Sequence, residues 1–209
     1  MEILFFLITI ILGAIIHEYA HGWMADRLGD PTARLAGRLT LNPLAHIDMV
    51  GTVILPLSFL LIYLMTGNYF LFAYAKPVPV NPYNIKRGKS GLGWVSFAGP
   101  ASNLFIALAF GIFIRIFGQF FDQTFINFLA VIVYANILLA IFNLVPLPPL
   151  DGSKILFAVL PDKFNNFKIF LQTYGIFIFF FFIFYLYVVI DPIIRYLFEF
   201  FTGIKIGFG

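Results

Sequence analysis

Long apolar runs decide what this chain can fold into, because each is near the roughly 20 residues that a helix needs to cross a bilayer. They cover residues 3–23, 50–75, 94–117, 125–144 and 170–190. The chain is 61% hydrophobic and only 11% charged, whereas soluble domains usually carry about 25% charged residues. We therefore expect an all-α polytopic membrane protein with about five to six transmembrane helices. One integral-membrane domain would span residues 1–209, with a core over 1–160 and C-terminal helices over 168–202.

Composition also limits the chemistry of the chain. There is no cysteine, which excludes disulfides and thiol catalysis and leaves histidine and carboxylate side chains to hold any metal ion. The net charge of +3 fits basic loops that face anionic lipid headgroups. Partners are expected to be the lipid bilayer and membrane-embedded proteins, with no nucleic acid.

Prolines mark the irregular segments. Residues 76–93 contain Pro77 and Pro79 between valines, which predicts a loop with an extended, edge-like part. Three further prolines between residues 145 and 150 predict an unwound stretch after the helix at 125–144. Pro192 is expected to separate the helix at 170–190 from a short last helix at 192–201.

The first apolar run carries ionisable side chains where lipid is expected. Its sequence His17-Glu18-Tyr19-Ala20-His21 is an H-E-x-x-H pattern, and on a helix the two imidazoles lie about 40° apart with roughly 6 Å of rise. Both can bind one metal ion, with the glutamate placed as general base for a metal-bound water, as in zinc-dependent peptidases. The alternative is a pair of histidines hydrogen-bonded to neighbouring helices. Burying these groups unpaired would cost several kcal/mol, which favours the metal site.

A third ligand is needed, because catalytic zinc normally has three protein ligands and one open position. His46 and the acidic residues that reach membrane depth are candidates. Asp151 stands out because it follows the proline-rich stretch and precedes Gly152 and a predicted helix at 153–160. From these residues alone, two interpretations of Asp151 remain: a ligand carried into the bundle, or the N-cap of the following helix.

The motifs together resemble one known family. HEYAH in the first helix, AGPASN in a central helix and NLVPLPPLDG further on are similar to the site-2 proteases, a family of intramembrane zinc metalloproteases. With the intervening segments GRLTLNPLAHID and FAYAKPVPVNP, the chain most resembles the compact prokaryotic branch that lacks an inserted PDZ domain. The resemblance spans roughly residues 10–160, and three ordered motifs are far more specific than any alone.

Carried over residue by residue, the resemblance implies that His17, His21 and Asp151 bind one Zn²⁺ per chain and that Glu18 is the general base. It implies hydrolysis of peptide bonds within or next to transmembrane segments of membrane-anchored substrates, as in regulated intramembrane proteolysis. Asn103 resembles a position that assists the active site or binds substrate, and residues 76–80 resemble a strand-like element that pairs with an extended substrate. For both, a purely structural role remains an alternative.

His46 lies close to Asp48 in the segment LNPLAHID. This pair could support a metal site from outside its ligand shell. We expect instead a surface histidine that is satisfied by its neighbours, and we do not include it among the ligands.

The ligands constrain the topology. If residues 50–75 crossed the membrane, His21 and Asp151 would emerge on opposite faces, and the 13 basic residues would divide seven against six. A re-entrant segment at 50–75 brings the two residues to one face and divides the basic residues ten against three. By the positive-inside bias, the active site is then nearer the cytoplasmic face of the cell membrane.

Other functions remain open from the sequence. A membrane metal-ion transporter also needs histidine and carboxylate ligands, but it does not need Glu18 as a base. A proteolytically inactive membrane scaffold would keep the fold without the chemistry. A peptidase acting on soluble or prenylated substrates is the nearest enzymatic alternative, and it would take its third ligand from a different motif.

Overall fold

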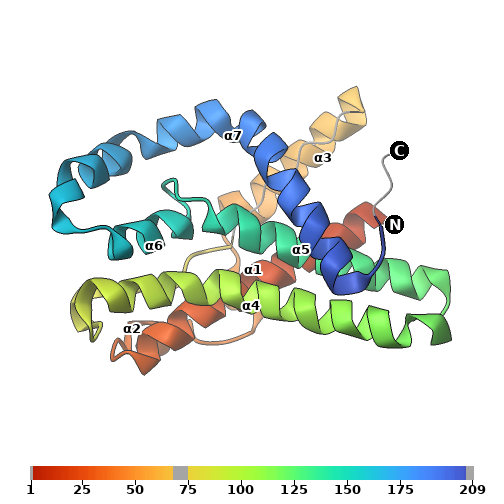
Figure 1. The fold of residues 1–209 in the computed structure, drawn as a ribbon, viewed down its shortest axis with the longest axis horizontal. Helices are drawn as coiled ribbons and strands as arrows, with labels where there is room; N and C mark the ends of the chain where they lie inside the picture. Colours follow the sequence, from red (N-terminus) through yellow and green to blue (C-terminus); the bar gives the residue numbers. More distant parts are fainter. Residues whose placement is uncertain (1, 68–74, 206–209) are drawn as a thin grey trace.

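A computed structural model of the chain describes residues 2–67 and 75–205. Over these residues the protein is helical and has no β-strand (Figure 1). The α-helices are α1 (Glu2–Arg27), α2 (Thr32–Leu35), α3 (Leu55–Thr66), α4 (Gly88–Phe117), α5 (Gln123–Leu144), α6 (Asp151–Val159) and α7 (Asn165–Thr202). Short 3₁₀ turns lie at Pro43–His46, Pro82–Asn84, Gly118–Phe120 and Asp162–Phe164, and a π-helical turn lies at Met49–Ile54.

Three helical segments within the described residues are long and apolar enough to span a membrane: Leu4–Arg27, Gly88–Phe120 and Gln123–Leu144. The predicted all-α membrane fold is therefore confirmed. The larger count of five to six spans stays a prediction, since α3 has only 12 residues and a span needs about 20.

Helix α4 is the centre of the bundle and packs against α1, α5, α6 and α7. Small residues allow this close approach. A Cβ at Gly111 would lie 2.7 Å from Phe201 Cβ in α7, and one at Gly93 would lie 2.8 Å from Ala158 Cβ in α6. The predicted loop at 76–93 is wrong at its end, because α4 begins at Gly88. Gly91 and Gly93, inside this helix, allow close packing rather than a turn.

Helix α7 is continuous through Pro192, so the predicted break into two C-terminal helices is wrong. Figure 1 shows α7 as one helix that changes direction part-way along. The residues around the proline are held by packing, with Ile190 and Ile194 buried in the main hydrophobic core. Arg195 Nε also donates to Asp191 Oδ2 at 2.6 Å, across the proline. These contacts offset the backbone hydrogen bond that proline removes.

Residues 47–67 lead away from the bundle, and the chain is back at it at residues 75–76. The π-helical turn and α3 form the outward part, and residues 68–74 lie outside the described chain. The two ends meet, because Lys76 N donates to His46 O at 2.9 Å and Arg38 Nη2 donates to Lys76 O at 2.8 Å. A segment whose ends are joined in this way favours a re-entrant path, which stays a prediction.

His46 lies at the base of this excursion and is only 1% exposed. The expectation of a surface histidine is therefore wrong. Its Nε2 lies 2.7 Å from Thr40 O, six residues earlier in the chain. Asp48 accepts hydrogen bonds from the N–H groups of Val50 and Gly51, and so caps the turn that follows.

Candidate active site

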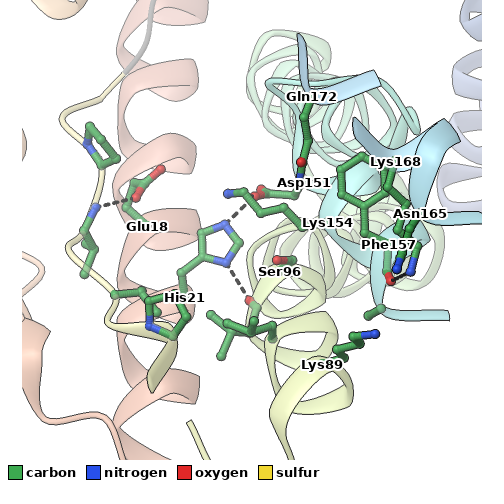
Figure 2. A pocket seen from close by; sticks show the side chains of 17 residues that line it. Glu18, His21, Lys89, Ser96, Asp151, Lys154, Phe157, Asn165, Lys168 and Gln172 are labelled. Carbon is green, nitrogen blue, oxygen red and sulfur yellow. Dashed lines mark hydrogen bonds and ion pairs between the residues drawn. The ribbon is translucent and has the colours of Figure 1, made fainter. Parts of the chain in front are cut away.

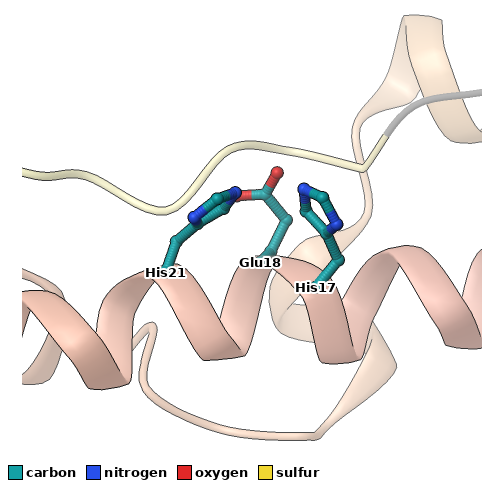
Figure 3. Close-up of side chains that lie close together, drawn as sticks. All are labelled: His17, Glu18 and His21. Carbon is teal, nitrogen blue, oxygen red and sulfur yellow. The ribbon is translucent and has the colours of Figure 1, made fainter. Parts of the chain in front are cut away.

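The HEYAH motif lies in the second half of α1, as its spacing predicts. The His17 and His21 rings are one helical turn apart, with ring centroids 4.6 Å from each other, and both residues are buried. Figure 3 shows Glu18 between them, on the same face of the helix. One potential ligand atom from each of the three residues lies within 4.8 Å of the others.

Asp151 is brought to this pair from 130 residues further along the chain. Its Oδ2 lies 3.0 Å from His17 Nε2 and 2.9 Å from His21 Nε2. The residue is buried at the first position of α6, and the N-cap of that helix is Leu150. The N-cap interpretation of Asp151 is therefore wrong, because its carboxylate faces the histidines.

Gly152 explains how the backbone delivers this carboxylate. A Cβ at residue 152 would lie 2.2 Å from Leu144 O, at the C-terminal end of α5. Only glycine lets the start of α6 lie so close to the end of α5. The Asp-Gly pair thus combines a ligand-type side chain with the one residue that permits its approach.

Hydrogen bonds on the far side of each imidazole fix the tautomer. His21 Nδ1 lies 2.7 Å from Val95 O, which can only accept, so this nitrogen carries the proton. His17 Nδ1 lies 2.7 Å from Asn103 Oδ1, while Asn103 Nδ2 donates to Asn136 Oδ1 at 3.0 Å. Asn103 Oδ1 is therefore the acceptor of this bond, and His17 Nδ1 also carries the proton. In the neutral rings, both Nε2 lone pairs point toward Asp151.

Two imidazole nitrogens and a carboxylate oxygen thus converge on one point, and each brings an electron pair. A divalent cation satisfies all three, and two histidines with one carboxylate leave an open position that suits catalytic zinc. Lys154 Nζ lies 3.1 Å from Asp151 Oδ1, so the other oxygen of this carboxylate faces the histidines. These residues fit a zinc ion.

Gly99 makes room at this point. A Cβ there would lie 2.5 Å from His21 Nε2 and 2.6 Å from His17 Nε2. A methyl group at residue 99 would therefore occupy the space between the ligand nitrogens. In the sequence, the segment AGPASN supported the family resemblance and supplied Asn103 as a candidate, and this role of Gly99 was missed. The sequence feature that could have revealed this role is a glycine in a helix that has to pack against the two histidines.

A cleft of about 590 Å³ opens from the ligands. Figure 2 shows it between α1 with an extended segment on one side and the helices that carry Ser96, Asp151 and Lys168 on the other. The extended segment touches the HEYAH motif, because Val78 N donates to Glu18 Oε2 at 2.8 Å. Lys154 lines the same cleft, next to Asp151.

Asn103 lies behind the site rather than in the cleft. It is 0% exposed, and its side chain bonds to His17 Nδ1, Asn136 and, at 3.1 Å, Gly13 O. These interactions do not test the predicted contact between Asn103 and substrate. What they show directly is an amide hydrogen-bonded to a histidine.

A buried cluster of two histidines and a carboxylate beside a glutamate, in a bundle whose helices are long and apolar enough to span a membrane, is the arrangement expected of a membrane metallopeptidase. Comparisons with known proteins identify its family. The profile of peptidase family M50 matches residues 110–186. A Bacillus subtilis (strain 168) protein named "Putative zinc metalloprotease YwhC" is 33% identical over 183 residues, which cover 84% of this chain and 78% of that protein.

A second relative is the Mycolicibacterium smegmatis protein named "Putative zinc metalloprotease Rip2", which is 28% identical over 147 residues. The match covers 66% of this chain and 50% of that protein. No solved structure matches. The chain belongs to peptidase family M50, the site-2 protease family. It is a zinc-dependent membrane metalloprotease, and the described residues contain no strands from which an inserted PDZ domain could be built.

Proposed function

We propose that this protein hydrolyses peptide bonds within or next to transmembrane segments of membrane-anchored proteins, in regulated intramembrane proteolysis. His17, His21 and Asp151 would hold one zinc ion per chain, and Glu18 would act as general base. The observation that carries the proposal is the convergence of two Nε2 atoms on Asp151 Oδ2, at 3.0 and 2.9 Å, beside Glu18.

Glu18 is the group that moves the proton. Its Oε2 accepts the Val78 N–H, which orients the carboxylate and leaves the other oxygen for the proton of the attacking water. The same oxygen then returns the proton to the leaving amine. Bound zinc supplies the Lewis acidity for attack on the peptide carbonyl.

The cleft favours an extended substrate. A helical substrate has its backbone carbonyls already hydrogen-bonded, so it must unwind before attack. The wall at residues 77–80 is itself extended chain, and Pro77 and Pro79 offer no N–H. Val78 is engaged with Glu18, so Val80 is the donor that this stretch offers to a substrate strand. Helix-breaking residues in the substrate should promote cleavage.

Asn103 would support the reaction through His17. Because it accepts from Nδ1 on the side away from Asp151, it fixes the tautomer in which Nε2 binds metal. We propose this orienting role in place of the substrate contact predicted from sequence.

The site would lie nearer the cytoplasmic face, in one domain over residues 1–209. Support comes from the basic loops that adjoin the end of α1 beyond the HEYAH motif: Lys86 N donates to Leu28 O at 2.8 Å, and Arg38 contacts Lys76 O. Basic residues of both loops therefore lie on one side of the bundle, as a cytoplasmic location requires.

The test compares the wild type with Glu18→Gln and Asp151→Ala, measuring zinc content and cleavage of a synthetic transmembrane substrate in detergent. We expect Glu18→Gln to keep zinc and lose cleavage by about 10²–10⁴-fold, the usual contribution of a general base. Asp151→Ala should lose both. Asp162→Ala, a change at an exposed carboxylate, is the matched control.

Two results would overturn the proposal. If the wild type binds zinc and cuts none of several unwound substrates, the protein is a scaffold. If Glu18→Gln transports metal into vesicles as well as the wild type does, and neither protein cleaves substrate, the protein is a transporter.

A further inference from the structure

Asp30 is a buried carboxylate for which the proposed chemistry has no use. It lies three residues after α1 and is 0% exposed. Its Oδ1 accepts from Thr32 N at 3.2 Å, from the Thr32 hydroxyl and from Asn84 Nδ2 at 3.0 Å, and its Oδ2 accepts from Asn81 N at 2.6 Å. Every partner is a donor, so only an ionised carboxylate satisfies them all.

The charge of Asp30 is consistent with this arrangement. Burial by itself would raise the pKa of Asp30, but the hydrogen bonds from Thr32, Asn84 and Asn81 outweigh it. The pKa therefore lies below its ordinary value of 3.8. The group is ionised at neutral pH, and its hydrogen bonds are of the stronger, charge-assisted kind.

Two of these bonds join Asp30 to residues that are far from it in the sequence. Asn81 and Asn84 are 51 and 54 residues away from Asp30 in sequence, and they belong to the chain that forms the extended wall of the cleft. A local cap of α2 would need only the Thr32 contacts. The bonds to residues 81 and 84 instead attach a distant segment to the end of the catalytic helix.

The attachment lies close to Glu18 along the chain. Between Lys76 and Lys86, the wall is hydrogen-bonded to α1 and its C-terminal extension at Val78, through Glu18, and at Asn81 and Asn84, through Asp30. Three residues of extended chain span about 10 Å. A bond that fixes residue 81 therefore fixes where the Val78 N–H lies relative to the Glu18 carboxylate.

We propose that Asp30 is a positioning residue for peptide hydrolysis, which holds residues 78–84 so that the Val78 N–H stays on Glu18 and the cleft wall keeps its place. The inference rests on the proposed function, since it assigns a role to this wall in turnover.

The experiment compares the zinc-loaded wild type with Asp30→Asn and Thr32→Val in detergent. Asparagine keeps the shape but turns an NH₂ group toward at least one donor, at residue 81 or at residues 32 and 84. Thr32→Val removes one hydroxyl donor to the same carboxylate and leaves both bonds to the cleft wall. Four quantities are measured: zinc content, amide hydrogen exchange of peptides over residues 76–86, kcat and KM.

We expect Asp30→Asn to keep its zinc, to exchange faster across 78–84, and to lose about tenfold or more in kcat/KM, the effect of losing one hydrogen bond to a charged group. Both kcat and KM should change, because Glu18 and the substrate wall are both affected. Thr32→Val should match the wild type in exchange over 76–86 and in kinetics.

The inference is overturned if Asp30→Asn keeps wild-type kcat and KM, or if Thr32→Val has the same defects, since Asp30 would then serve only the turn after α1. Should Asp30→Asn lose zinc or fail to fold, Asn84→Ala removes one bond on the wall side alone and must still slow turnover. If the wild type cuts nothing, the proposed function fails. In that case, faster amide exchange over residues 78–84 in Asp30→Asn alone would still support the attachment of the cleft wall to Asp30. Unchanged exchange in Asp30→Asn would refute it.

Discussion

The two walls of the cleft are built in different ways. The helical wall, formed by α1, α4 and the start of α6, holds each histidine by contacts on both sides, as when His17 meets Asp151 and Asn103. The extended wall, residues 76–86, is attached through separate hydrogen bonds, one of which reaches Glu18, and through Val80 and Ile85, which pack in one hydrophobic cluster with Ala25. Changes in the helical wall should therefore affect metal binding, and changes in the extended wall should affect turnover with the metal in place.

The largest effect is expected at Gly99. Gly99→Ala places a methyl group 2.5–2.6 Å from both Nε2 atoms, so we expect zinc affinity to fall by more than about 100-fold, beyond the loss of a histidine's hydrogen-bond partner. Isothermal titration of the metal-free protein with zinc measures it. Gly111→Ala in the same helix is the control, because its methyl group meets Phe201 instead. It should lower thermal stability and leave zinc affinity unchanged.

Asn103 is the next test of the helical wall. Asn103→Leu removes the acceptor for His17 Nδ1, and we expect zinc affinity to fall by about 10–100-fold. Asn136→Ala is the control, since it breaks the same hydrogen-bond chain without touching His17. If zinc affinity is unchanged in Asn103→Leu while KM for substrate rises, the substrate-binding role predicted from sequence is correct and the orienting role is wrong.

The sequence predicts the helical wall better than the extended one. The spacing of His17 and His21 follows from helical geometry, which the local sequence determines. Asp151 could be proposed because the proline-rich stretch and Gly152 mark an irregular entry into a helix. Its contact with His17 joins residues 134 apart, and periodicity alone cannot predict a contact at that separation.

Other features depend on tertiary packing. The tautomers depend on Val95 O and Asn103, and the space for a metal depends on Gly99 facing two imidazoles. Helix α7 continues through Pro192 because buried neighbours hold it there. From the sequence alone, Asp30 is typical of a turn residue after a helix. Its bonds to Asn81 and Asn84 depend on the tertiary contact between the two loops.

Val78 tests the extended wall. Val78→Pro removes the N–H that donates to Glu18 Oε2, and proline suits an extended backbone. We expect zinc affinity to stay the same and kcat to fall about tenfold, as for the loss of one hydrogen bond to a charged group. Val80→Pro removes an N–H from the same segment without touching Glu18; because that N–H is the donor offered to substrate, it should raise KM and leave kcat unchanged. A loss of zinc in Val78→Pro would show that the two walls are not separable.

The smallest effect is the response of the extended wall to acid. The pKa of Asp30 in the folded protein lies below 3.8, so the stability that its carboxylate contributes is present above that value and is lost as the pH falls through the folded pKa. Asp30→Asn lacks this contribution at every pH. We therefore expect the difference in thermal midpoint between wild type and Asp30→Asn to be largest near neutral pH and to narrow below about pH 4. Both proteins are compared metal-free in one detergent, so that groups titrating alike in both cancel. If the difference in thermal midpoint stays constant down to about pH 3, the bonds to Asn81 and Asn84 do not depend on the charge of Asp30. The extended wall would then be held in place without an electrostatic contribution from this carboxylate.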